Sequence, residues 1–418
     1  MARLLVLFVT AFVDMVGLTM IVPLLPFYAK DYGANAAVVG VLISAFSVAQ
    51  LAVAPAWGRL SDRHGRRPAI LAGLLVTSAA YVVFAFAASV PALLLSRIVQ
   101  GLGGGTIGVV QAYVADASPP EARTKSLGWL SAVTSLGAVA GPAFGSLLVV
   151  AGGQRAPGLA AAALSLLVAV FGWRYLRESR GMRLSGTHLP PSNLTGRAAV
   201  ARVVHHWREP ASRLIWIYAV AIGAFYGTIQ IVPLLLMQRF SVTEVNVGYF
   251  VMYLGAMGVV IRALVLGRAV DWLGEARLSR WGIVILAAGL ILTGLATSGP
   301  LLALAFTLMP IGTAFLFPCV TGLLSRIVIS GDRGLYMGVQ HTFGGVSRVA
   351  FPVSAGLLMD HFAVGVPFWI AGLLVLGTLP LSAALDVRVP EPAEAIAARR
   401  ISAADVTAEL PVEPANPS

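Results

Sequence analysis

Charged side chains are scarce in this chain of 418 residues: Asp, Glu, Lys and Arg make up 11% of it, and apolar side chains 58%. A soluble domain carries about 25% charged residues, which cover its surface. Because the mean hydropathy is +0.86, most of the surface must face lipid rather than water. The composition therefore excludes an ordinary soluble enzyme or a soluble DNA-binding domain.

Cysteine is almost absent, since Cys319 is the only one and lies in an apolar run. One thiol forms neither an intrachain disulfide nor a cysteine-based metal site, and no other metal-ligand spacing is present. We therefore predict neither a metal nor a cofactor. Acidic residues are also few, 18 against 29 basic ones, so the net charge is +11.

Long apolar runs are what the sequence has instead. Twelve of them are long enough to cross a bilayer as helices, which takes about 20 residues, and they are too long for barrel strands. The predicted fold is an all-α membrane protein with twelve transmembrane helices. The predicted spans are 4–28, 38–57, 69–88, 91–115, 127–150, 158–176, 213–238, 246–266, 281–298, 300–325, 335–358 and 363–385.

The basic residues lie mainly on one side of these spans. If the N-terminus is cytoplasmic, the inner loops and tails hold 23 of the 29 Lys and Arg residues, and the outer loops hold only Lys30, Arg155 and Arg239. This asymmetry predicts a protein of the cell (inner) membrane with both termini in the cytoplasm. The basic residues therefore orient the protein in the membrane and contact anionic lipid head groups. Because this explains the positive charge, no nucleic-acid partner is predicted.

The two halves of the sequence repeat. Three markers recur at an offset of 209 or 210 residues, about half of the chain, which predicts two pseudo-symmetric six-helix bundles of the same topology. We expect bundles at 1–178 and 213–386, a cytoplasmic linker at 179–212 with an amphipathic helix around 197–208, and a disordered tail at 387–418. The markers are Gly17 with 21–25 and Gly227 with 231–235, the Gly-Arg-x-x-Asp-x-x-Gly motifs at 58–65 and 267–274, and Pro142 and Pro352.

The loop between the second and third spans reads Gly-Arg-Leu-Ser-Asp-Arg-His-Gly-Arg-Arg-Pro at 58–68. Its glycines and proline suit a tight turn, and its arginines suit a cytoplasmic loop. An acid in so basic a turn, Asp62, repeated as Asp271, predicts a carboxylate that pairs with an arginine or caps a helix at the bundle interface. Such a contact can form in one conformation and break in another, as a gate requires.

This loop resembles the signature G-x-L-[SA]-D-R-x-G-R-[KR] of the major facilitator superfamily, and the twelve spans and the repeat extend the resemblance over essentially the whole chain. It implies a transporter with alternating access. It also implies that Asp62 faces the start of span 11 and that Arg66 pairs with Asp116, so that both contacts lock the outward-open state. The implied gating residues are Gly58, Asp62, Gly65, Arg66, Asp116 and Asp271.

Span 5 is rich in glycine around one proline. Glycines at its spacing let helices approach closely and a proline permits a kink, so generic packing is one explanation. The pattern also resembles the antiporter motif of drug:proton exchangers, with Ser146 where the last glycine is usual. The motif residues are Gly128, Gly137, Gly141, Pro142 and Gly145.

Charges inside the spans are candidate functional groups, because inserting one costs at least about 2.5–3.5 kcal/mol. Asp14 is the only acid well inside a span, and Arg97 begins an Arg-x-x-Gln-Gly motif in span 4. We expect the two to pair, since each alone is costly. The pair is either structural or, as the resemblance to the exchangers implies, the proton-coupling element.

Two further arginines lie within spans. Arg262 is expected to reach the membrane interface, and Arg348, near the midplane, to face a cavity where it counters a substrate anion or pairs with Asp14. The other candidates for the cavity wall are polar and aromatic residues that packing would explain equally well. The substrate-cavity candidates are Gln100, Tyr113, Tyr226, Gln230, Phe317 and Arg348.

The nearest resemblance is to the tetracycline-efflux proteins, through span 1, the loop motif, span 5 and the Gly-Leu-Tyr-Met-Gly run at 334–338. Those proteins carry an acid in span 9, and residues 281–298 contain none, which favours the wider class of drug exporters. The prediction is a monomeric secondary transporter that exports small, mostly hydrophobic drug-like molecules in exchange for protons. The main alternative is a porter of an organic anion or other metabolite, with Arg348 and Arg97 facing the substrate. A membrane enzyme would need a convergent acid–base or metal constellation, which the sequence does not show. A receptor would be indicated if the protein transported no substrate at all.

Overall fold

Helices form all the regular secondary structure of the residues that the structure describes, which are 2–104, 106–119, 122–176, 178, 195–328 and 332–383 of a computed structural model. Eleven apolar segments of this part are helical and long enough to cross a bilayer, and a shorter apolar helix covers Val366–Ser382. The predicted all-α fold with twelve transmembrane helices is therefore confirmed.

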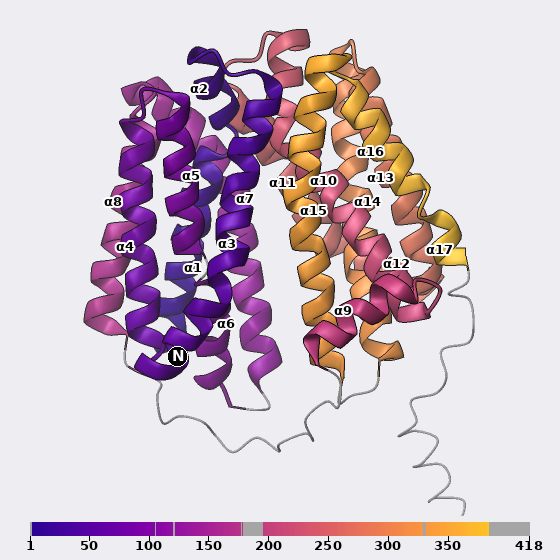
Figure 1. Ribbon diagram of the computed structural model, residues 1–418, viewed down its shortest axis with the longest axis horizontal. Helices are drawn as coiled ribbons and strands as arrows, with labels where there is room; N and C mark the ends of the chain where they lie inside the picture. The colour runs from indigo at the N-terminus through magenta and orange to yellow at the C-terminus, as the bar shows by residue number, and fades with distance from the viewer. Residues whose placement is uncertain are drawn as a thin grey trace, which may run out of the picture.

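The first six spans form one bundle, here named the N-bundle, which is drawn in indigo to magenta in Figure 1. Its first span is broken around Pro23, whose ring leaves no N–H to continue the helical ladder. The N-bundle comprises α1 (Ala2–Ile21) with α2 (Leu25–Asp31), α3 (Ala36–His64), α4 (Arg66–Ala85), α5 (Val90–Gly104) with α6 (Ile107–Asp116), α7 (Arg123–Gly152) and α8 (Ala156–Tyr175).

The second six spans form the C-bundle in the same order, which confirms the predicted pair of six-helix bundles (Figure 1). The C-bundle comprises α10 (Pro210–Phe240), α11 (Val247–Leu264) with α12 (Leu266–Leu273), α13 (Glu275–Leu295), α14 (Gly299–Ile327), α15 (Arg333–His361) and α16 (Val366–Leu376) with α17 (Leu379–Ala383). Residues 179–194 of the predicted linker and all of the predicted tail lie outside the described residues.

One short helix, α9 (Gly196–His205), lies where the amphipathic linker helix was predicted. The Thr195 hydroxyl caps it by accepting a hydrogen bond from the backbone N–H of Ala198 at 3.3 Å. Its apolar residues Ala199 and Val203 are fully buried, and the Trp216 indole donates to the Val203 carbonyl at 3.3 Å. The apolar face of α9 therefore packs on α10 and α15 of the C-bundle.

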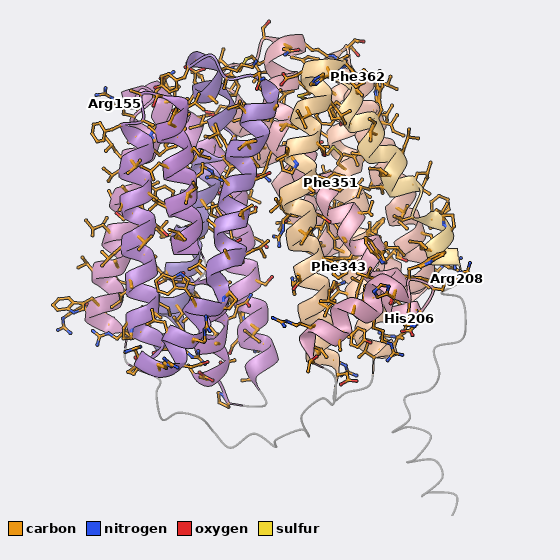
Figure 2. The ribbon with its side chains drawn as sticks, in the orientation of Figure 1. Arg155, His206, Arg208, Phe343, Phe351 and Phe362 are labelled. Carbon is orange, nitrogen blue, oxygen red and sulfur yellow. The ribbon has the colours of Figure 1, made fainter. Side chains whose placement is uncertain are left out.

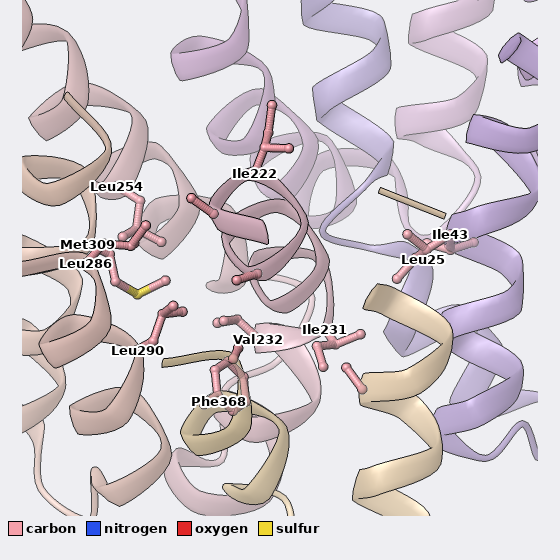
Figure 3. Packing of buried hydrophobic residues seen from close by; sticks show 14 of the residues in the cluster. Leu25, Ile43, Ile222, Ile231, Val232, Leu254, Leu286, Leu290, Met309 and Phe368 are labelled. Atoms are coloured by element: carbon pink, nitrogen blue, oxygen red, sulfur yellow. The ribbon is translucent and has the colours of Figure 1, made fainter. Parts of the chain in front are cut away.

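The molecule has two ends, which we name for use below. The linker end is the one at which α8 ends and α10 begins, and it lies at the bottom of Figure 1; the distal end is the one at which α3 and α11 begin. One buried apolar cluster joins both bundles and includes Leu25, Ile43 and Ile231 (Figure 3). A second cluster, which includes Leu7 and Trp57, lies within the N-bundle alone.

The bundles approach each other closely at two glycines that face the prolines of the sequence repeat. A Cβ atom added at Gly40 of α3 would overlap the carbonyl of Pro352 in α15, and one added at Gly248 of α11 would overlap the carbonyl of Pro142 in α7. The two prolines are equivalent positions of the sequence repeat. Only glycine permits this approach, and in lipid such van der Waals contacts hold helices together because no hydrophobic force drives them. These two glycine–proline crossings close the distal half of the interface.

The crossings predict the effect of a larger side chain at Gly248. Gly248→Val should force α11 away from the Pro142 carbonyl, because overpacking of this kind costs about 1–3 kcal/mol, and the distal ends should separate. Cys319 is the only cysteine, so one substitution gives a background for spin labels at Arg155 and Phe362, which lie at the distal ends of the two bundles in Figure 2. The distance between the labels should increase in the variant.

Gly338→Val is the matched control for this experiment. Gly338 also lies in a transmembrane helix, α15, but an added Cβ atom would meet no atom within 4 Å. The control should therefore leave the distance between the labels unchanged. An unchanged distance in Gly248→Val as well would contradict the role of the glycine–proline crossings.

Candidate functional site

A cavity of about 470 Å³ lies between the two bundles. Of the residues predicted to line it, Tyr226, Gln230 and Arg348 do so. Arg262, expected to reach the membrane interface, lines it too, as does Arg97. We name this the central cavity. Its walls come from α1, α3, α5, α7, α10, α11, α14 and α15.

A second cavity, of about 630 Å³, lies inside the N-bundle and is named the N-bundle cavity. Asp14 lines it together with side chains of α4, α6 and α7. Several of its polar groups are neutral, among them Thr10 and Gln111. Met15 and Thr134 line both cavities, so only a thin wall separates them. The acid and the arginines thus occupy different spaces.

The expected ion pair between Asp14 and Arg97 is absent from the described part of the chain, so that prediction is wrong. Arg97 is 1% exposed, donates to Oε1 of Gln100 one turn away, and lies 5.0 Å from the centroid of the Phe46 ring. A cation over an aromatic face is stabilised by the ring quadrupole. Arg97 is therefore held by its own surroundings, while α1 turns Asp14 toward the N-bundle cavity.

A group of buried polar atoms lies between Asp14 and Arg97. Tyr81 of α4 is 1% exposed, and its ring and hydroxyl contact the backbone of α1 at Gly17, one turn from Asp14. The charges of both Asp14 and Arg97 act on Tyr81. Three atoms of this group have no well-formed hydrogen bond, namely the Tyr81 hydroxyl, which lies close to Gln100, Nε2 of Gln100 and Nε of Arg97. We name Tyr81, Gln100 and Arg97 the polar bridge.

The remaining predicted cavity residues lie elsewhere. Gln100 is buried in the polar bridge and is not part of the cavity wall. Tyr113 has no exposed surface and belongs to the apolar cluster of the N-bundle. Phe317 packs edge-on against Tyr218 at 5.6 Å between ring centroids. For Tyr113 and Phe317 the packing explanation holds.

The glycines and the proline of span 5 contact two different helices, α1 of the same bundle and α11 of the other bundle. Added Cβ atoms at Gly137, Gly141 and Gly145 would strike α1, at Phe12, Thr19 and Met20 in turn. The motif therefore positions the helix that carries Asp14.

The other motif residues do not face α1. Pro142 faces Gly248 of the other bundle, and an added Cβ atom at Gly128 would meet nothing within 4 Å.

At the linker end, the predicted ion pair between Arg66 and Asp116 is present at 3.2 Å. Arg66 also binds Asp62, at 2.9 Å. The Glu178 carboxylate accepts hydrogen bonds from the backbone N–H groups of Arg66 and Arg67, at 2.9 and 3.2 Å. It lies where a side chain at Gly65 would be, and Gly65 has φ +106°, so this position requires glycine.

The implied contact between Asp62 and the start of span 11 is absent from the described residues, because the carboxylate is paired within its own bundle. An added Cβ atom at Gly58, or at Gly334 at the start of α15, would meet nothing within 4 Å. Asp271 is exposed and has no ion pair within the part of the chain described. At these positions the described residues show no contact between the linker ends of the two bundles.

The C-bundle has its own version of the Arg66–Asp116 pair, which sequence reasoning missed. Arg326 binds Glu275 at 2.9 Å. These residues follow Asp116 and Arg66 by 210 and 209 positions, the offsets of the repeat, with the charges exchanged. The repeat was visible in the sequence, but the reversal of sign concealed the equivalence.

A polar contact at the distal end, also missed, joins the bundles. The Asp360 carboxylate at the end of α15 accepts hydrogen bonds from the backbone N–H groups of Ala36 and Ala37 at the start of α3, at 2.9 and 2.8 Å. The N-terminus of a helix favours a negative charge. We name this contact the distal latch.

Ser146 makes the corresponding contact between α7 and α11. It accepts a hydrogen bond from the Gly248 N–H at 3.0 Å and donates to the Glu244 carbonyl at 2.7 Å. The residue that departs from the antiporter pattern therefore binds the other bundle.

Comparisons with known proteins agree with this architecture. The sequence model of the Major Facilitator Superfamily matches residues 7–279 and 261–412. Multidrug resistance protein 2 of Bacillus subtilis is 30% identical over 89% of this chain and 92% of its own length. The class B tetracycline resistance protein of Escherichia coli is 26% identical over 88% of this chain and 90% of its own.

A solved structure shares the fold. The inward-facing, occupied structure of a bacterial homologue of the human lysosomal transporter Spinster has a TM-score of 0.72 at 15% identity and covers 91% of this chain and 96% of its own. The chain belongs to the Major Facilitator Superfamily and is a multi-pass membrane transporter.

The distal latch predicts a shift of population on removal of the Asp360 charge. Asp360→Asn keeps the shape but weakens two hydrogen bonds to a helix N-terminus, so the ratio of distally closed to open molecules should fall about three- to tenfold. Spin-label distances across the distal end measure this ratio. Asp31→Asn removes a distal carboxylate that accepts a hydrogen bond from Gln154 of its own bundle and should leave the ratio unchanged; an equal change in both variants would show that the latch has no specific role.

Proposed function

Because the chain belongs to the Major Facilitator Superfamily, we propose that it exports small, mostly hydrophobic drug-like molecules across the cell membrane in exchange for protons. The observation that carries the proposal is the presence of two cavities, one between the bundles and one around the lone intraspan acid, Asp14. Relatives that match most of the chain are named for multidrug and tetracycline resistance, which supports a drug as the substrate.

In the proposed orientation both termini are cytoplasmic, so the linker end faces the cytoplasm. The distal latch and the glycine–proline crossings then close the outer side, and the conformation is inward-facing. A substrate enters the central cavity from the cytoplasm or the inner leaflet. Export requires the linker end to close around Asp62 and the start of α15 while the distal contacts open.

The polar bridge supports coupling between the two cavities. A proton on Asp14 removes the negative charge that acts on Tyr81, and Tyr81 is next to Gln100 and Arg97. Arg97 in turn lines the central cavity. Exchange requires that proton binding at Asp14 lower the affinity of the central cavity for substrate through a change in the conformation of the polar bridge, and by linkage the substrate then opposes the proton. The inward proton gradient then drives export.

The glycine motif of span 5 also supports coupling through direct contacts between helices. Gly141 and Gly145 of α7 hold α1 in close contact, and Pro142 of the same helix contacts Gly248 of the C-bundle. A change at Asp14 therefore reaches the bundle interface through one helix. We assign the gating role to the loop residues at 58–66, together with Asp116 and Asp271. We also propose that the chain is divided into two six-helix bundles with a linker between them, as the sequence repeat predicts.

Neutralising Asp14 tests the coupling. Asp14→Asn should abolish uncoupler-sensitive efflux of a panel of fluorescent drugs from cells that lack other exporters, because the side chain no longer exchanges a proton. Exchange of a substrate across the membrane without a gradient should persist, since the central cavity is unchanged. Membrane levels of the variant should equal those of the parent.

Asp31→Asn is the control, because Asp31 ends the same span at the distal end, outside both cavities. It should keep gradient-driven efflux. Full coupling in Asp14→Asn would remove Asp14 from the mechanism, and absence of flux for every member of the panel in the parent would contradict drug export itself.

The polar bridge makes a separate prediction at Tyr81. Tyr81→Phe removes a buried hydroxyl that has no well-formed hydrogen bond, so the thermal unfolding temperature should change little. Gradient-driven efflux should nevertheless fall about tenfold if the hydroxyl transmits the state of Asp14.

Tyr32→Phe should show the opposite pattern. The Tyr32 hydroxyl donates to the Ala87 carbonyl at 2.8 Å, far from the polar bridge. Its loss should lower stability slightly and leave efflux unchanged. If Tyr81→Phe also transports normally, the polar bridge has no part in coupling.

A further inference from the structure

The charged residues in the described wall of the central cavity are all arginines. Arg97 comes from α5, Arg262 from α11 and Arg348 from α15, and no Asp or Glu is among the described residues that line the cavity. Asp14 lines the N-bundle cavity instead. A ligand in the central cavity therefore meets three cations and no anion.

These arginines are incompletely paired. Arg348 and Arg262 form no ion pair or side-chain hydrogen bond with any described residue, and Nε of Arg97, which is 1% exposed, has no partner. Arg97 is buried and Arg348 is partly buried, and cations held away from bulk water are costly unless an opposite charge and hydrogen bonds compensate them. The protein does not supply that charge here, so a bound anion would complete the site.

The three arginines lie at different depths. Arg262 is exposed in the last turn of α11 at the linker end, where its charge attracts an anion toward the open side. Arg348 is partly buried near the middle of α15. Arg97 already binds Gln100 and lies on Phe46. Arg348 is thus the deep guanidinium with the most free donors, and a planar fork of this kind binds a carboxylate in bidentate fashion.

The rest of the wall suits an apolar body. Phe46, Phe225 and Tyr226 offer flat aromatic surfaces, and aliphatic residues such as Ile229 fill the space between them. We infer that the substrate is an amphiphilic organic anion, with an aromatic or aliphatic body and a carboxylate or sulfonate that Arg348 binds. This inference rests on the proposed export function and assigns its substrate class.

An anionic substrate changes the charge balance of exchange. One proton entering and one monovalent anion leaving move two elementary charges in the same sense, whereas a neutral substrate moves one and a monovalent cation moves none. Export of an anion should therefore depend most strongly on an inside-negative membrane potential. In this scheme the proton binds to Asp14 from the outside, leaves it on the cytoplasmic side and never shares a cavity with the anion.

Two dyes of the same xanthene skeleton test the inference, namely fluorescein, which is anionic, and a cationic rhodamine ester. The purified full chain in an uncharged detergent should bind fluorescein at least about tenfold more tightly than the rhodamine ester, as measured by fluorescence anisotropy. Arg348→Gln should weaken fluorescein binding about tenfold or more, the scale of one charge-assisted hydrogen bond. Arg348→Lys should retain most of the preference, and it also shows that the position tolerates substitution.

Arg197→Gln is the matched control, since it removes one positive charge on exposed α9, far from the cavity wall. It should leave both affinities unchanged. In proteoliposomes that contain the parent, fluorescein export should increase when a valinomycin potassium potential is imposed, and rhodamine ester export should not.

The outcomes distinguish failure of the anionic substrate class from failure of the proposed drug export. Equal binding of the two dyes, or unchanged fluorescein binding in Arg348→Gln, overturns the anion assignment. Export of the rhodamine ester alone also overturns it but leaves drug export standing. If neither dye is bound or transported, and no member of the wider drug panel is exported, the proposed function fails together with the inference.

Discussion

The close approach of α3 to α15 and of α7 to α11 is the constraint on which the rest of the structure depends. Lipid offers no hydrophobic force to press the bundles together, so their contact relies on backbone surfaces that can touch. Gly40 against the Pro352 carbonyl and Gly248 against the Pro142 carbonyl provide two such surfaces, related by the sequence repeat. The latch at Asp360 and the Ser146 hydrogen bonds add directional contacts at the same end. A central cavity closed at one end follows from this arrangement.

The scarcity of charge then determines how the interior is divided. Each charge inside a span must be stabilised where it lies, because moving it through lipid is costly. Arg97 is stabilised by Gln100 and Phe46, and Asp14 lines a cavity with hydroxyl and amide groups. Neither needs the other as a direct partner. In the proposed coupling, the state of Asp14 therefore reaches Arg97 through intervening groups. Tyr81 is one of these groups, because it contacts α1 and is affected by the charges of both residues.

The spans and the repeat were predictable because apolar length and glycine–proline spacing are set by bilayer thickness and helix packing. The Arg66–Asp116 pair followed from the resemblance of the loop. The direction in which each side chain points was harder to predict than the spans. A helix between lipid and a bundle core is apolar on both sides, so its sequence does not reveal which side points inward. This explains why Tyr113 was expected in the cavity but lies in the core, and why the Asp14–Arg97 pair was expected. Asp360 was missed because its partners are backbone N–H groups, which no side-chain pattern shows.

The two bundles contribute different chemistry to the same architecture. The pair at Glu275 and Arg326 reverses the charges of Arg66 and Asp116, so both bundles place an ion pair between the start of one span and the end of the next, with opposite polarity. The N-bundle holds Asp14 and the polar bridge, whereas Arg262 and Arg348 come from the C-bundle. In the proposed mechanism Asp14 and Arg348 lie on opposite bundles, so a link between these two residues must cross the interface. The glycine–proline crossings that close the distal end are thus also the contacts through which a change in one bundle must reach the other.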